Sequence, residues 1–252
     1  MMIFTIAWRE LRTLFLSPLA WSILAVVQLI LAYLFLSQLD TYMSLQSQLL
    51  GMPGAPGVTE IVVAPIFGNA TIVLLLVVPM LTMRLISEER RAQTMALLFS
   101  APLSMSEIVI GKFLGVMGFL LIMVAMLSLM PLSLLLGGTL DFGLLASALL
   151  GLLLLLSCFA AVGLFMSTLT DQPTVAAISS FGVLLMLWIV DWAGSGSTGQ
   201  VSELFAYISI LRHFESLLRG VFDSSDVIYY LLFVTFFIGL SIRRLDADRL
   251  QH

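Results

Sequence analysis

Long apolar runs, separated by short polar stretches, constrain this chain more than any other feature of its sequence. A helix needs about 20 apolar residues to cross the hydrocarbon core of a bilayer, with a range of about 17–25. Only 10% of the residues are charged and 60% are hydrophobic, so a water-soluble globule could not bury the apolar surface. We therefore predict an all-α membrane protein, a single transmembrane domain over 1–252, with six transmembrane helices. The predicted spans are 20–36, 61–83, 108–130, 144–166, 175–190 and 227–242.

Two segments outside these spans are amphipathic. Residues 1–16 place apolar side chains at helical spacing around Arg9, Glu10 and Arg12, a pattern typical of an N-terminal interfacial helix. Residues 201–218 have the same periodicity and carry too many charges to span. They predict an amphipathic helix on the outer side of the membrane, before the last span, which either lies on the surface or is re-entrant.

The segment 84–107 is the longest polar interruption in the first two thirds of the chain. Its residues from 88 to 99 have helical spacing, and a helix cannot continue easily into the residue before Pro102. Ser104 or Ser106 is placed to cap the next helix. The segment predicts a short surface helix, a proline break and a new helix that enters the membrane. A plain charged loop between two spans is the alternative that charge alone favours.

The third span begins with Gly111, Gly115 and Gly118. Small residues at a spacing of about four let helix backbones approach closely within a membrane. We therefore expect another helix to pack closely against this part of the span.

Basic residues set the expected orientation, because loops on the cytoplasmic side carry an excess of Lys and Arg. With both termini cytoplasmic, only Arg212 and Arg219 lie outside. We expect a multi-pass protein of a bacterial cytoplasmic (inner) membrane, with membrane lipid as a partner. The basic residues on the cytoplasmic side are then Arg9, Arg12, Arg84, Arg90, Arg91, Lys112, Arg243, Arg244 and Arg249.

Motifs for catalysis are absent from the sequence. Gly111-Lys112 lacks the upstream glycine and the following Ser or Thr of a phosphate-binding loop, and neither HExxH nor GxSxG occurs. We predict a chain that is no enzyme, with no catalytic residue, no metal site and no cofactor of its own. Cys158 stands alone in an apolar run, and the net charge of -4 gives no indication of a nucleic-acid partner.

Two stretches resemble one known family. The first stretch resembles, in the order of its residues, the first coupling segment of ABC-2 type permeases, and most closely that of their gliding-motility and nitrous-oxide-reductase-maturation branch. The residues that carry the resemblance are Glu88-Glu89-Arg90-Arg91, Thr94, Leu97-Leu98, Ser100–Ser104, Glu107–Val109 and Gly111-Lys112. The same branch has a His-Phe-Glu-Ser run and an Arg-Gly pair before its last span, as here at 213–216 and 219–220. Gln93 is a departure, because the family commonly has Gly before the Thr.

The resemblance implies a permease subunit that couples ATP hydrolysis on a separate cytoplasmic ABC ATPase subunit to export of an unidentified substrate. ATP and Mg²⁺ would bind to that partner, and a second permease copy or a related permease would complete the transporter. A scaffold that passes ATPase-driven force to an outer-side partner, without moving a substrate, is the alternative. The expected ATPase-coupling residues are Glu88, Glu89, Arg90, Arg91, Thr94, Met95 and Leu98.

The outer amphipathic helix is a candidate contact surface for a protein with a periplasmic domain. We assign that contact to His213, Phe214, Glu215 and Arg219. For His213 a structural role is the competing interpretation, because an imidazole finds hydrogen-bond partners readily.

Overall fold

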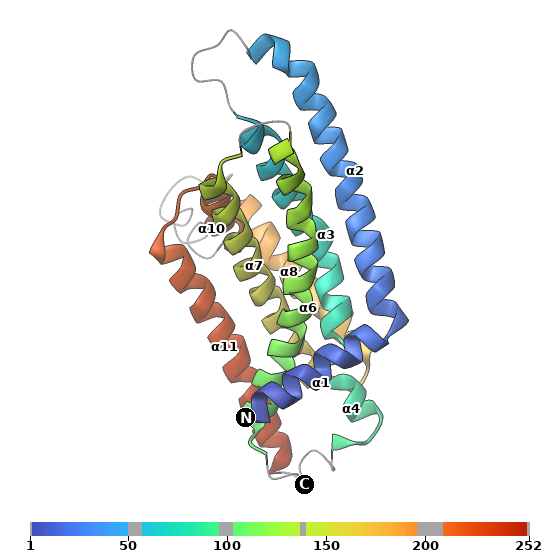
Figure 1. Ribbon diagram of the computed structural model, residues 1–252. Coiled ribbons are helices and arrows are strands. Elements are labelled where there is room, and N and C mark those ends of the chain that lie inside the picture. The colour runs from blue at the N-terminus through green and yellow to red at the C-terminus, as the bar shows by residue number, and fades with distance from the viewer. Residues whose placement is uncertain (1, 50–56, 96–102, 137–139, 196–208, 251–252) are drawn as a thin grey trace.

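The computed structural model describes residues 2–49, 57–95, 103–136, 140–195 and 209–250, and every regular element within those ranges is helical (Figure 1). Short turns of π-helix (Thr59–Val63) and 3₁₀-helix (Leu134–Leu136) adjoin two of the helices. The helices are α1 (Met2–Leu16), α2 (Pro18–Leu49), α3 (Ala64–Thr82), α4 (Ser87–Arg91), α6 (Met105–Ser133), α7 (Phe142–Leu169), α8 (Pro173–Ser195), α10 (Ile210–Leu218) and α11 (Ser224–Arg249).

Five of the predicted spans fall within a helix, and the span 61–83 covers part of the π-helical turn and all of α3. This confirms the prediction of an all-α membrane protein. Five stretches of the described chain are long and apolar enough to cross a membrane, and a shorter apolar helix, Pro173–Ile189, lies where the fifth span was expected. The five are Pro18–Gln46, Thr59–Arg91, Met105–Ser133, Phe142–Leu169 and Ser224–Arg249.

The first span is longer than predicted. The sequence predicted a span that ends at Leu36, whereas α2 continues to Leu49. No glycine or proline interrupts the stretch from Leu19 to Leu49. The hydroxyls of Thr41 and Ser44 bond to carbonyls of their own helix, at 2.9 and 2.7 Å, so these polar residues do not end it.

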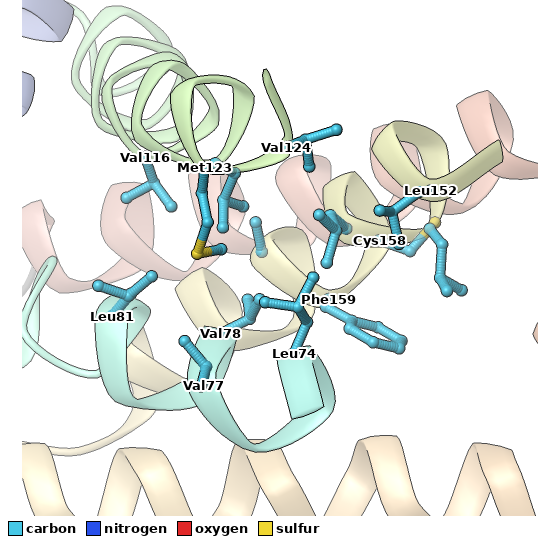
Figure 2. Packing of buried hydrophobic residues seen from close by; sticks show 14 of the residues in the cluster. Leu74, Val77, Val78, Leu81, Val116, Met123, Val124, Leu152, Cys158 and Phe159 are labelled. Carbon is cyan, nitrogen blue, oxygen red and sulfur yellow. The ribbon is translucent and has the colours of Figure 1, made fainter. Parts of the chain in front are cut away.

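The core of the bundle lies where α3, α6 and α7 meet. Figure 2 shows side chains from the three helices directed toward one another, among them Leu74 of α3, Met123 of α6 and Phe159 of α7. Thr82 of α3 lies so close to Gly163 of α7 that a Cβ there would be 2.0 Å from its hydroxyl oxygen. The two helices are therefore in backbone-level contact beside the turn that leads into α4.

The N-terminal helix α1 lies across one end of the bundle, close to α4 and to both termini, and α10 lies toward the opposite end (Figure 1). We call these the α4 end and the α10 end. A Cβ on Gly111 would meet Ile6 Cβ at 2.7 Å, and one on Gly115 would meet Glu10 Cβ at 2.6 Å and the Ala7 carbonyl at 3.0 Å. The expected close approach at these glycines is confirmed, and its partner is α1.

We predict that Gly115→Ala destabilises the protein because its methyl group would overlap the backbone and Glu10 side chain of α1. Overpacking of this kind costs about 1–3 kcal/mol. Gly118→Ala is the matched control, since its Cβ would meet Leu11 at an ordinary 3.5 Å. Thermal unfolding in detergent should show a lower Tm for the first variant alone; equal Tm values would contradict the close contact.

Candidate functional site

The helix α4 begins on a hydrogen-bonded anchor supplied by α7. The Ser167 hydroxyl, fully buried, accepts hydrogen bonds from the amides of Ile86 and Ser87, both at 3.0 Å, and donates one to the Met83 carbonyl at 3.1 Å. The first amides of a helix lack partners within the helix. A single side chain of a span therefore satisfies the start of α4 and fixes it in place.

The end of α4 is a tight left-handed turn. Gln93 has a φ of 55°, the Thr94 amide donates to the Glu89 carbonyl at 3.0 Å, and the Gln93 amide donates to the Arg90 carbonyl at 3.0 Å. This is a Schellman arrangement, whose left-handed position is usually glycine. The expectation of one helix from 88 to 99 is therefore wrong over its described part, because α4 ends at Arg91.

Adjacent side chains of α4 bind two different parts of the bundle. Glu89 points to the α1–α6 side, where its Oε1 lies 2.9 Å from Lys112 Nζ and 3.8 Å from Arg9 Nη2. Lys112 also lies 3.4 Å from Oε2 of Glu10. The Lys112 side chain is only 3% exposed, so its ammonium depends on these two carboxylates rather than on water.

Arg90 points to the other side of the bundle. Its guanidinium is paired with Asp248 of α11 and lies 3.8 Å from Asp171 in the turn between α7 and α8. Arg244, one turn earlier on α11, lies 3.6 Å from Asp248. We call the eight charged residues of both sides the α4 junction: Arg9, Glu10, Glu89, Arg90, Lys112, Asp171, Arg244 and Asp248.

The rest of the predicted coupling residues divide by exposure. Glu88, Arg91 and Thr94 are exposed, and Met95 is partly buried against the core. Leu98 and Pro102 lie outside the described residues. Among the described residues, Glu88 forms no ion pair with Arg84 or Arg91, and Arg84 lies between the end of α3 and the start of α4.

An open groove runs beside the exposed side of α4. It encloses about 610 Å³ between α4 and the turn from α7 to α8. Its lining residues are Arg90, Arg91, Gln93, Asp171, Gln172 and Thr174. All of them are polar, so the groove is suited to a polar protein segment rather than to an apolar ligand.

The predicted outer-side residues also divide. His213 Nδ1 lies 2.6 Å from Asp226 Oδ1, and its ring stacks on Tyr229 at 4.3 Å. These contacts favour the structural interpretation of His213. Phe214 is 2% exposed and packs toward Gly151 of α7, which corrects its assignment as a contact residue. Glu215 and Arg219 remain exposed and lie 3.8 Å apart. The proposed contact surface is thereby reduced to those two charges.

The last helix has its own cap at the α10 end. Asp223 accepts a hydrogen bond from the Ser225 amide at 3.0 Å. The bond holds the pKa of the Asp223 carboxyl below its ordinary value, because it favours the ionised form. At the α4 end, Ser104 caps α6 and forms a capping box with Glu107, which confirms one of the two predicted caps.

Sequence reasoning did not select Lys112, Glu10, Ser167 or Asp248 as site residues. An ion pair of Lys112 could have been predicted, because a lysine one to two turns inside an apolar helix needs an anionic partner. Its partners are distant in sequence, and no local pattern identifies them. Within the described ranges, no group of three or more His, Cys, Asp or Glu residues is placed to hold a metal ion.

These features define a class: a multi-pass helical membrane protein with a short polar helix fastened across one end of its bundle. A family model for ABC-2 family transporter protein matches residues 4–248, and the chain belongs to this family. It is a membrane permease component of an ABC transporter, a class that works with an ATPase partner. No curated protein sequence matches the chain.

We predict that Gln93→Gly stabilises the end of α4. A non-glycine residue in the left-handed region costs about 1–2 kcal/mol, part of which is offset by the greater freedom of glycine in the unfolded chain. Hydrogen exchange at Thr94 should slow in Gln93→Gly and stay unchanged in Gln93→Ala, which loses the side chain but keeps the strain. Faster exchange in the glycine variant would contradict the assignment.

We predict that Ser167→Ala loosens α4 from α7, because two amides lose their acceptor at about 1–3 kcal/mol for each unsatisfied group. Ser157→Ala is the matched control in the same helix, since its hydroxyl donates to the Leu154 carbonyl of α7 itself and not to α4. Limited proteolysis near α4 should accelerate in the first variant and not in the second. Equal cleavage rates would show that Ser167 does not anchor α4.

Proposed function

We propose that this chain is the membrane-spanning permease subunit of an ABC exporter, and that a separate ATPase docks on α4. The family assignment supports the class, and the exporter direction follows from the resemblance in sequence. On this proposal the α4 end is cytoplasmic in a bacterial inner membrane. Basic residues support that orientation, since the α4 end carries those of α1, α4, the start of α6 and the end of α11. Arg212 lies on α10, and Arg219 directly follows that helix.

The two-sided construction of α4 carries the proposal. Glu88, Arg91 and Thr94 are exposed; Arg91 lines the open polar groove, and Glu88 lines a second pocket beside α1 and α3. The other side is fixed to α1 and α6 through Glu89 and to α11 through Arg90. A partner that binds the exposed side would therefore apply force to several helices at once.

This geometry divides the predicted coupling residues into two roles. Glu88 and Arg91 would make the polar contacts with the ATPase, whereas Glu89 and Arg90 would hold α4 to the bundle. ATP and Mg²⁺ would bind only to the ATPase. Because the six spans make half of a transporter in this family, a second copy of the chain or a related permease would complete it.

Docking is tested by reversing the exposed charges, Glu88→Lys with Arg91→Glu. We expect at least a tenfold loss of affinity for the partner ATPase subunit, about 1.4 kcal/mol, with no loss of folded protein. Glu215→Lys with Arg219→Glu is the matched control, as it reverses an exposed pair at the C-terminal end of α10. Unchanged binding in the first variant would overturn the assignment of α4 as the docking helix.

Transport itself is tested by flux in reconstituted vesicles that contain the permease and its ATPase. ATP-dependent movement of a substrate, dependent on Glu88 and Arg91, supports the permease function. ATPase binding and stimulation without movement of any substrate tested would instead support the force-transmitting scaffold.

A further inference from the structure

The most buried cation of the α4 junction is the one that joins three helices. Lys112 belongs to α6, its side chain is 3% exposed, and it reaches Glu89 of α4 at 2.9 Å and Glu10 of α1 at 3.4 Å. The carboxylates are themselves 20% and 15% exposed. Ion pairs on a surface contribute little, but removing one partner of a buried pair leaves an uncompensated charge that strongly disfavours the altered arrangement. The three helices are therefore held in one relative position.

The helix α1 is also fixed to α6 by backbone contact. Gly111 and Gly115 leave no room for a side chain between the two helices. Sliding of α1 along α6 would separate Glu10 from Lys112 and would at the same time disrupt the packing of α1 against Gly111 and Gly115. The polar and the steric contacts thus act on the same few residues, and α1 with the start of α6 forms one rigid unit.

The corner from α1 to α2 is rigid as well. The Trp21 indole nitrogen donates a hydrogen bond to the Phe15 carbonyl at 2.8 Å, and the two rings pack edge to face at 5.7 Å. Phe15 packs in turn on Phe119 of α6, at 5.3 Å between ring centroids. A displacement of α1 therefore moves the start of α2, which is the first span.

We propose that Lys112 and Glu10 are positioning residues of the coupling step, which carry the displacement of α4 to α1 and, through the α1–α2 corner, to the first span. The inference rests on the proposed function, because it presumes that an ATPase moves α4. This route from α4 to the first span is separate from the covalent connection between α4 and α6. The N-terminal helix is then a working part of the transporter rather than a membrane anchor.

The decisive variant is Glu10→Met, which removes the α1 carboxylate but keeps an unbranched side chain beside Gly115. Lys112 keeps its shorter ion pair with Glu89, so α4 and α6 stay joined. We expect ATPase affinity within about twofold of the unaltered protein and at least a tenfold fall in permease-stimulated ATP hydrolysis. Glu10→Gln keeps a neutral acceptor for Lys112 and should give an intermediate loss.

Arg12→Met is the matched control on the same helix. Arg12 is exposed, and its loss removes one charge from α1 without touching the junction. It should leave both affinity and stimulated hydrolysis unchanged. Thermal unfolding of all three variants identifies any that fold poorly, and Glu10→Gln then serves in place of Glu10→Met.

A distance measurement separates transmission from a merely structural role. Spin labels at Thr13→Cys on α1 and Ala247→Cys on α11 occupy exposed positions, and the native Cys158 is buried. In the complex with its ATPase, ATP should shift the distance between the labels, and Glu10→Met should abolish the shift while the ATPase stays bound. A full shift and full stimulation in Glu10→Met would overturn this inference and leave docking on α4 intact. Loss of ATPase binding in the Glu88 and Arg91 variant, tested separately, reports only on docking.

Discussion

The ammonium of Lys112 lies where water does not reach it, and two carboxylates from different helices replace the missing solvent. Much of the α4 end follows from that requirement. An apolar helix tolerates an internal lysine only if anionic groups come to it, so α1 and α4 are both drawn to the start of α6. The glycines of α6 then allow α1 to approach closely enough for Glu10 to reach the lysine.

The spans, the N-terminal helix and the cap of α6 could be predicted from sequence, because each depends on local periodicity or on one residue at a helix start. Apolar run length identifies a membrane helix, and a serine three residues before a glutamate is a recognisable capping box. The core helix packing in α3, α6 and α7 does not follow from such patterns, because all three are apolar on most sides. Which faces meet depends on small residues such as Gly163, whose partner Thr82 lies on another span.

The candidate site was harder to read for the same reason. The residue order identified its charged segment but did not show which residues are exposed and which pair with other helices. Glu89 and Arg90 are of the same residue types as Glu88 and Arg91, and only the neighbouring helices distinguish the two pairs. The length of α4 was misjudged because Gln93 is an ordinary helix residue by propensity. Its left-handed conformation is one that glycine adopts more readily than other residues. Here the Thr94 hydroxyl adds a hydrogen bond to the Glu89 carbonyl at 3.2 Å, which helps to hold the turn.

The composition of the α4 junction has an electrical consequence. Its cations, Arg9, Arg90, Lys112 and Arg244, are matched in number by its anions, Glu10, Glu89, Asp171 and Asp248. Moving one elementary charge through a membrane potential is worth about 2.3 kcal/mol per 100 mV. A neutral assembly that shifts as a unit carries no gating charge, so the motion that we propose for the junction would do no work against the resting voltage of the cell.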